Sequence, residues 1–240
     1  MKFNKFISSA LLFICAAATI APVSADEKAI ETVKSVLEER FPRVEVTSVS
    51  PSPAPGWIEV IAGTQVIYVD ESGKYMMYGS LVEIDGSRNL TEQAMSNVRL
   101  KAMEKIDETE MVVYRPEKVE HTVTIVTDID CPYCRKLHSE MDEYLANNIK
   151  VQYLLMPLKG RVSYQKSLSV WCSDDKNLAL DIAKAGGSLD QESCEHPLAK
   201  HESVSRALGI RGTPAILLED GTLLPGYVPI KDLIEKIEAI

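Results

Sequence analysis

TVTIVTDIDCPYC, residues 122–134, is the stretch that decides the fold. Its first part, 122–127, is apolar and rich in β-branched side chains, which favours a strand. Apolar residues then recur at helical spacing, so we predict a helix over 131–146. This change from strand to helix places Cys131 at the N-terminus of the predicted helix.

The two cysteines of this motif suit thiol–disulfide chemistry. Unpaired N–H groups at a helix N-terminus stabilise an anion, and such a position lowers a thiol pKa from about 8.5 to as low as about 3.5. We therefore expect Cys131 to be the attacking thiol and Cys134, one turn further on, the resolving thiol. Pro132 fits the first helical turn, where an N–H would have no partner. The alternative is half of a zinc site with His138 as third ligand; because no good fourth ligand is found, we expect no metal.

Residues 1–25 have the pattern of a secretory signal peptide. Two lysines precede an apolar run over 10–20, and a small-residue cleavage site ends at Ala25. A lipid anchor on Cys15 is the alternative, but the bulky Ile14 stands where a small residue is required. No later apolar run reaches the roughly 18 residues that span a membrane, so we expect a soluble, exported protein.

The net charge and the number of cysteines limit the partners and the chemistry that the chain can have. Without residues 1–25 the chain keeps 24 basic and 35 acidic side chains, a net charge of −11 that argues against nucleic acid as a partner. Four cysteines remain, and an even number in an exported protein indicates two disulfides. We expect a redox-active pair, Cys131 with Cys134, and a structural pair, Cys172 with Cys194, because the second pair lies in a polar, helix-rich segment without redox spacing.

The N-terminal part predicts a small α+β unit over 26–87. The expected elements are a helix over 26–41 and strands over 44–49, 57–62, 65–69 and 74–84. A unit of this size is marginally stable alone, so dimerisation through an exposed strand edge is one reading and a free-standing domain with a covered edge is the other. The unit contains neither cysteine nor histidine, so we expect no catalytic residue in it.

The rest of the chain predicts a linker helix over 88–108 and a thioredoxin-type α/β domain over 109–240. Its expected strands cover 111–114, 122–127, 151–156, 215–219 and 222–225, and its other helices 163–171, 176–185, 197–208 and a last one from Ile230. Strand, helix and strand around the CPYC motif imply a right-handed crossover between parallel strands. The remaining helices form an insertion. Thr213-Pro214 precedes the last hairpin, and we expect it to be the second piece of the site.

These features together resemble the periplasmic disulfide isomerase family that contains DsbC and DsbG. The resemblance rests on TDIDCPYC (127–134), KLH (136–138), GTPA (212–215), YVD (68–70), GKY (73–75) and YGSL (78–81). It implies a V-shaped homodimer in which cystatin-like N-terminal domains pair and two thioredoxin domains face one cleft.

The same resemblance implies the roles of the site residues. Cys131 is the nucleophile, Cys134 the resolving thiol, and Thr213, cis-Pro214 and Tyr133 bind the substrate. The Cys172–Cys194 pair matches the family's non-catalytic disulfide. The implied partners are misoxidised exported proteins and a membrane reductase of the DsbD type, with no cofactor.

Two departures leave alternatives open. The inner dipeptide Pro132-Tyr133 resembles DsbG, which favours a reductase of sulfenylated single cysteines. Asp130 directly precedes the nucleophile, where its charge would disfavour the thiolate, although we expect it instead to cap the helix and point away from the sulfur. From a different class, the chain could be chiefly a holdase, which would keep its activity after Cys131 is replaced.

Overall fold

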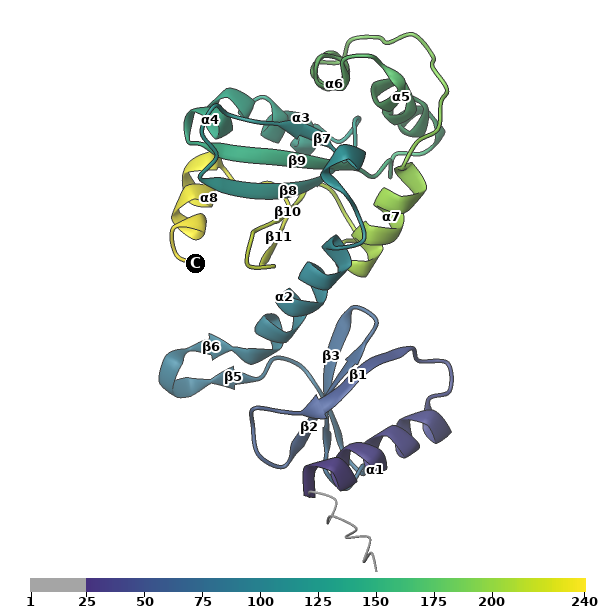
Figure 1. Cartoon of the computed structure of the whole chain (residues 1–240), viewed down its shortest axis with the longest axis vertical. Helices are drawn as coiled ribbons and strands as arrows, with labels where there is room; N and C mark the ends of the chain where they lie inside the picture. The colour runs from purple at the N-terminus through teal and green to yellow at the C-terminus, as the bar shows by residue number, and fades with distance from the viewer. Residues whose placement is uncertain (1–24) are drawn as a thin grey trace, which may run out of the picture.

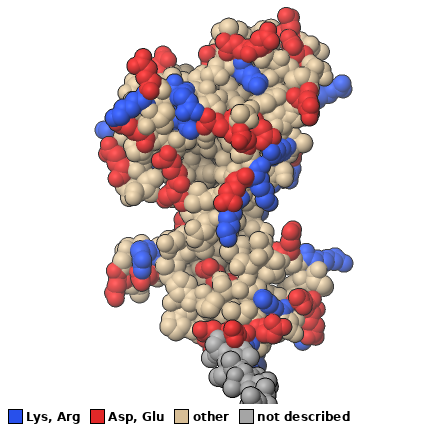
Figure 2. Space-filling model, in the orientation of Figure 1, with Lys and Arg blue, Asp and Glu red and all other residues tan. Residues whose placement is uncertain are grey.

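The computed structural model describes residues 25–240, so the predicted signal peptide lies outside the described residues except for its last position. Figure 1 shows a small N-terminal unit, one connecting helix and a larger C-terminal unit. On the face that Figure 2 shows, Lys and Arg side chains alternate with Asp and Glu side chains over both units. No helix within residues 25–240 is long and apolar enough to cross a membrane.

The N-terminal unit is a helix packed on an antiparallel sheet. Its elements are α1 (Ala25–Arg40), β1 (Val46–Pro51), β2 (Trp57–Ala62), β3 (Gln65–Asp70) and β4 (Met76–Tyr78). The strands pair in the order β1-β2-β3-β4. Val33 and Leu37 of α1 are buried against Ile58 and Val60 of β2, since residues four apart share one helix face. This helix therefore closes one of the two buried clusters in which the sheet takes part.

The strand predicted over 74–84 is divided in the structure. After β4 the chain leaves the sheet at Gly79, whose φ of 157° is rare for residues with a side chain. The chain then forms a separate hairpin from β5 (Val82–Glu83) and β6 (Arg88–Asn89), with a short 3₁₀ turn between them. The prediction was wrong at this point because it treated Gly79 and Ser80, which interrupt the apolar residues of this stretch, as part of one continuous strand.

The predicted linker helix is α2 (Leu90–Met103). Its N-cap is Asn89, whose side chain accepts a hydrogen bond from the Glu92 backbone N–H at 2.9 Å, and this satisfies one orphan donor of the first turn. Glu92 binds Arg99 further along the helix through its carboxylate. An asparagine cap and an intrahelical ion pair therefore set the start of this helix.

Helix α2 contacts both units directly. Near its start, Thr91 shares a 2.8 Å hydrogen bond with the hydroxyl of Tyr68 in β3. Near its end, Arg99 donates to the carbonyl of Gly221 at 3.1 Å. A Cβ at Gly221 would lie 2.5 Å from the carbonyl oxygen of Ser96, so only glycine permits this approach of the C-terminal unit to α2. The helix is thus fastened to both units at residue-specific contacts.

The C-terminal unit is built on a five-stranded sheet. Its strands are β7 (Val112–Tyr114), β8 (His121–Thr127), β9 (Ile149–Leu155), β10 (Ala215–Leu217) and β11 (Leu223–Pro225). The order is β11-β10-β8-β9-β7, and β8 and β9 are parallel while the other pairs are antiparallel. The predicted parallel crossover is confirmed, and the sheet has the arrangement expected of a thioredoxin-type domain.

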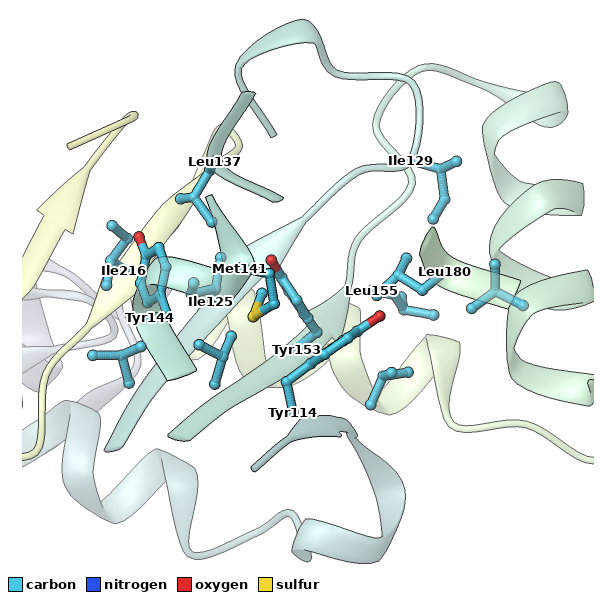
Figure 3. Packing of buried hydrophobic residues seen from close by; sticks show 14 of the residues in the cluster. Tyr114, Ile125, Ile129, Leu137, Met141, Tyr144, Tyr153, Leu155, Leu180 and Ile216 are labelled. Carbon is cyan, nitrogen blue, oxygen red and sulfur yellow. The ribbon is translucent and has the colours of Figure 1, made fainter. Parts of the chain in front are cut away.

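Helices cover both faces of this sheet (Figure 1). The helices of this unit are α3 (Pro132–His138), α4 (Met141–Ala146), α5 (Arg161–Cys172), α6 (Lys176–Lys184), α7 (Leu198–Ala207) and α8 (Ile230–Ile237), of which α5 and α6 lie beyond the end of the sheet in Figure 1. Alternate strand residues enter different cores: Ile125 and Tyr153 join the cluster with α3, α4 and α8 (Figure 3), whereas Val126 and Leu154 join the one with α7. Because consecutive positions meet two different cores, each strand has adjacent apolar residues at its buried centre.

The helix predicted over 131–146 is two helices, α3 and α4. At the break, the Ser139 hydroxyl donates to the carbonyl of Lys136 at 2.7 Å, and the Glu140 N–H donates to the carbonyl of Leu137 at 3.1 Å. These hydrogen bonds join residues three apart rather than four apart. Such bonds tighten the last turn, and α3 ends there. The periodicity continues across the break, so the apolar pattern could not locate it.

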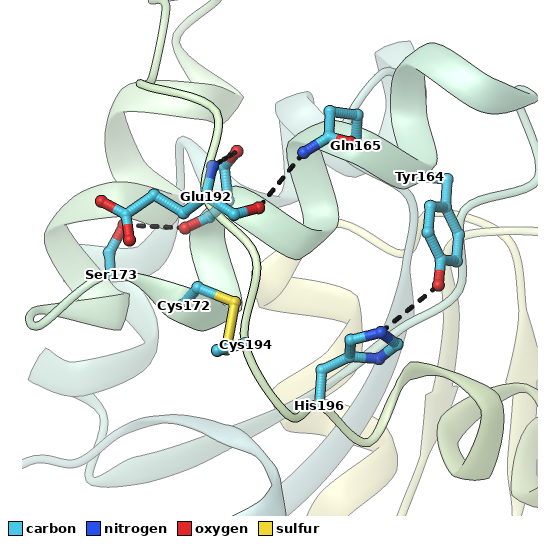
Figure 4. The surroundings of a disulfide bond; sticks show 8 residues. Tyr164, Gln165, Cys172, Ser173, Glu192, Cys194 and His196 are labelled. Carbon is cyan, nitrogen blue, oxygen red and sulfur yellow. Dashed lines mark hydrogen bonds between the residues drawn. A yellow bond between two sulfur atoms is a disulfide. The ribbon is translucent and has the colours of Figure 1, made fainter.

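The helical insertion is closed by a disulfide between Cys172 and Cys194 (Figure 4). It joins the end of α5 to the irregular segment before α7, across a separation of 22 residues. The same segment is bound to α5 by hydrogen bonds of Glu192 with Ser169 and Gln165, each 3.3 Å long. A stretch without regular structure is thereby held against the domain.

Candidate active site

The CPYC cysteines lie where β8 passes into α3. Cys131 occupies the N-cap position with an extended backbone (φ −76°, ψ 122°), and Pro132 is the first helical residue. Both cysteines are free thiols. Cys131 is 5% exposed and Cys134 1% exposed, so the second thiol is the more shielded one, as the spacing in a helix predicts.

Local hydrogen bonds favour the ionised form of Cys131. Burial by itself raises the pKa of this thiol, but hydrogen bonds from the backbone and side chain of Cys134, from the Thr213 side chain and from the backbone of Tyr133 outweigh burial and lower it. These donors stabilise the negative charge on sulfur. Cys131 is therefore the thiol that ionises first.

Cys134 has the opposite tendency. Burial raises its pKa, while the charge of Lys184 and hydrogen bonds from the Thr127 side chain and the Asp128 backbone only partly oppose this. A raised pKa keeps Cys134 protonated while Cys131 carries the charge. The two thiols are thus arranged for consecutive rather than simultaneous reaction.

The loop before β10 lies against the first cysteine. The Thr213–Pro214 peptide bond is cis, and the Cys131 thiol donates a hydrogen bond to the Thr213 carbonyl at 3.3 Å. The Pro214 carbonyl is held by the backbone N–H of Gly226 at 2.9 Å. Tyr133, between the cysteines, is 63% exposed. The predicted substrate-binding residues and both thiols therefore lie in one place.

The expectation that Asp130 caps the helix was wrong. No side chain caps α3. The Asp130 carboxylate instead accepts hydrogen bonds from Arg135 at 2.8 Å and Lys166 at 2.6 Å. Two cations therefore oppose the negative charge that precedes the nucleophile, and sequence order could not reveal Lys166 because it comes from α5.

His138, which the zinc alternative offered as a third ligand, is a buried residue of α3. Its Nδ1 lies 3.1 Å from the Tyr153 hydroxyl and its Nε2 lies 2.9 Å from Asp181. Asp181 also accepts a hydrogen bond from the Tyr114 hydroxyl at 2.6 Å; Figure 3 shows the two tyrosines side by side. Within residues 25–240 no group of three or more His, Cys, Asp or Glu side chains is arranged to hold a metal ion.

Sequence reasoning missed a lysine at this site. Lys184, at the end of α6, is 4% exposed, and its Nζ donates to the Thr127 hydroxyl at 2.6 Å and the Asp128 carbonyl at 2.7 Å. The sequence did indicate that Lys184 is buried, because it follows Leu180 by four residues and therefore lies on the same buried face of the helix.

Asp128, three residues before the nucleophile, is fully buried. Its carboxylate accepts hydrogen bonds from the Ser163 hydroxyl at 2.7 Å and from the N–H groups of Asp130 and Lys159, each at 2.8 Å. It fastens the end of β8 to α5 and the loop before it.

Two family models match the chain. The model of the disulfide bond isomerase protein N-terminal domain matches residues 21–92, and that of the thioredoxin-like domain matches residues 108–240. Together they cover most of the chain, on both sides of α2.

Similar proteins extend over nearly the whole sequence. The thiol:disulfide interchange protein DsbC of Escherichia coli is 34% identical over 232 residues, which is 95% of this chain and 94% of that protein. The protein of the same name from Salmonella typhimurium is 36% identical over 228 residues, 93% of this chain and 92% of that protein. A crystal structure of a disulfide interchange protein from Neisseria gonorrhoeae has a similar fold, with a TM-score of 0.51 and 23% identity, covering 56% of this chain and 97% of that one.

Proposed function

The chain belongs to the DsbC family of thiol:disulfide interchange proteins, and on that premise we propose how its own residues carry out the exchange. It is a disulfide isomerase that acts by thiol–disulfide exchange with a thioredoxin-like domain. A reductase of sulfenylated cysteines or a mere holdase is not favoured, since the similar proteins above are named as thiol:disulfide interchange proteins.

Cys131 begins the reaction and Cys134 ends it. The Cys131 thiolate attacks one sulfur of a non-native disulfide, a mixed disulfide forms, and the second substrate sulfur leaves as a thiolate. A substrate thiolate then displaces Cys131 to give a rearranged disulfide. Otherwise Cys134 displaces the substrate, which leaves reduced while a Cys131–Cys134 disulfide forms. The opposite pKa directions of the two thiols are the observation that carries these roles.

The loop at Thr213 and Pro214 receives the substrate. Its backbone lies within hydrogen-bond distance of the Cys131 sulfur, so an extended segment that pairs with this loop brings its own disulfide to the thiol. The exposed ring of Tyr133 adds an apolar contact on the other side of the nucleophile.

Export brings the protein to its substrates, and in the same compartment its active site requires a reductant. A signal peptide over residues 1–25 directs the chain to the periplasm, where exported proteins acquire wrong disulfides. Isomerisation requires the dithiol form of the site, so an electron donor must reduce any Cys131–Cys134 disulfide that forms. We assign that role to a membrane reductase of the DsbD type.

The protein acts as a homodimer. Each chain has an N-terminal dimerisation domain over 26–87, a linker over 88–108 and a catalytic domain over 109–240. Support comes from the edge strand β4 and its flank, where Tyr75 and Tyr78 are each 70% exposed. An unpaired, apolar edge suits pairing with a second copy.

Trapping of the mixed disulfide tests these roles. A Cys134→Ala variant, expressed with its signal peptide, accumulates disulfide-linked complexes with cysteine-containing exported proteins, because the resolving thiol is missing. A Cys131→Ala variant, the matched control, forms none. Equal trapping by the Cys131→Ala variant would contradict the assignment of the nucleophile.

A further inference from the structure

Lys184 is a charged group in an unusual position. Its side chain comes from α6 in the helical insertion and ends behind the CPYC motif, with 4% of the residue exposed. Both hydrogen-bond acceptors of its Nζ, the Thr127 hydroxyl and the Asp128 carbonyl, are neutral oxygens. A buried ammonium without a bonded carboxylate costs free energy, so its presence at the redox site calls for a function.

One of these contacts continues to the resolving thiol. The Thr127 hydroxyl, in a side chain that is 1% exposed, also favours the ionised form of Cys134 and so lowers the pKa of that thiol. A hydroxyl has a single hydrogen. When the Thr127 oxygen accepts from the Lys184 ammonium, this hydrogen remains available for the Cys134 sulfur. The contacts therefore form a directed chain from the ammonium through the hydroxyl to the thiolate.

The other charged and titratable groups near Lys184 come from several elements. They are Asp128 after β8, Cys131 at the start of α3, Arg135 and His138 on α3, and Asp181 on α6 itself. Burial lowers the pKa of Lys184 to about 8, which the negative charges of Cys134 and Asp128 partly oppose. The ammonium form thus predominates near neutral pH and gains most when Cys134 is ionised.

We propose that Lys184, acting through the Thr127 hydroxyl, is a positioning residue that stabilises the thiolate of Cys134 when that thiol resolves the mixed disulfide. The proposal rests on the assignment of Cys131 as the attacking thiol and deepens it. In this step Cys134 loses its proton to solvent, and its sulfur bonds to the Cys131 sulfur. The bond between Cys131 and the substrate breaks, and the substrate sulfur leaves with the electron pair and is protonated by solvent.

A pocket gives the lysine end of this hydrogen-bond chain access to solvent. Lys184 lines an open pocket between α3 and α6 together with Arg135, His138 and Asp181. The resolving thiol itself is almost fully buried. The pocket brings solvent to the lysine end of the hydrogen-bond chain, while the chain reaches the thiol from inside the domain.

A stopped-flow reaction with dithiobis(nitrobenzoate), an aromatic disulfide, separates the two thiols. The first coloured thiolate is released when Cys131 attacks, at a rate that depends on reagent concentration. The second is released when Cys134 resolves the adduct, at a rate independent of reagent concentration. The pH midpoint of this second phase reports the ionisation of Cys134 in the mixed disulfide.

Replacing Lys184 by an uncharged residue of similar length removes the ammonium. We expect Lys184→Met to raise the midpoint of the second phase by about one pH unit, which slows it about tenfold near neutral pH. The first phase should shift less, because the charge of Cys131 interacts with Lys184 more weakly than that of Cys134, and the high-pH plateau should not change. Thr127→Val has the same effect, and the double variant adds nothing further because both changes interrupt one chain. Thr127→Ser, which keeps the hydroxyl, restores the midpoint relative to Thr127→Val.

A second lysine of α6 provides the matched control. Lys176 lies over the Trp171 ring, 4.0 Å from its centroid, and Lys176→Met is expected to leave both phases as in the unaltered protein. A Lys184→Met protein with an unaltered second-phase midpoint, even if slower at every pH, overturns the proposal. A Cys131→Ser protein that still shows the concentration-dependent first phase would instead overturn the assignment of the attacking thiol.

Discussion

The sulfur of Cys131 lies 3.3 Å from the carbonyl oxygen of Thr213, although 82 positions separate the two residues in the chain. Antiparallel pairing of β10 with β8 produces this contact, since Ala215 pairs with Val126 at the end of the strand that leads to the CPYC motif. A substrate segment held by the Thr213 loop therefore meets the nucleophile without any rearrangement of the domain.

Tyr133→Ala should weaken substrate binding and leave stability unchanged. The ring is largely exposed beside the nucleophile, so its removal creates no cavity in the core but takes away apolar contact with an unfolded chain. We expect a higher KM for a disulfide-containing peptide, an unaltered reaction with a small aromatic disulfide and the same unfolding midpoint. A lower unfolding midpoint with an unchanged KM would show that the ring packs within the domain instead.

Asp130→Asn should lower the pKa of Cys131. The carboxylate that directly precedes the nucleophile disappears, while its partners Arg135 and Lys166 keep their positive charges. Because these groups are partly exposed, the expected decrease is less than about one unit. Ultraviolet absorbance of the thiolate against pH measures it, and a rise in the Cys131 pKa would contradict the prediction. Glu235→Gln, at an exposed acidic residue of α8, serves as the control.

Loss of the Cys172–Cys194 disulfide should destabilise the protein without removing its activity. A crosslink across this separation contributes about 3 kcal/mol to the free energy of unfolding. We expect a double Cys172→Ala/Cys194→Ala variant to unfold at lower urea concentration and to keep its thiol reactivity in buffer. Loss of thiol reactivity while the variant is still folded would place this disulfide in the redox reaction.

Stability should fall on acidification partly because of His201. This ring is fully buried; Nδ1 accepts from the Leu155 N–H at 3.0 Å and Nε2 bonds the Glu110 carbonyl at 2.6 Å. Burial lowers its pKa, which these backbone contacts only partly oppose. Below about pH 6.5 the unfolded chain therefore binds a proton that the folded ring resists, so the free energy of unfolding decreases.

His201→Gln provides the corresponding test. Glutamine does not titrate, so urea unfolding between about pH 6.5 and 5 should show a shallower decline in the variant than in the unaltered protein. His138, whose pKa is also lowered by burial, is expected to leave part of the slope in place. An identical slope in both proteins would exclude His201 as a source of the decline.

Local sequence patterns predicted the position of the site but not the residues of other helices that contact it. Helical spacing and the helix N-terminus were enough to place Cys131 and to rank Cys134 as the shielded thiol. Lys184 and Lys166 reach the site from the helical insertion, and only tertiary packing determines where their charges lie. The burial of His138 escaped prediction for the same reason, because its partner Asp181 belongs to α6.

The refolding of a scrambled, multi-disulfide protein at a fixed glutathione ratio tests the central claim most directly. The account predicts that the unaltered protein speeds recovery of native activity, and that Cys131→Ser abolishes this effect. The Cys134→Ser protein should keep some of it, because a substrate thiol can still displace Cys131. Equal recovery with the Cys131→Ser protein, or reduction of sulfenylated single cysteines without any unscrambling, would contradict the isomerase account.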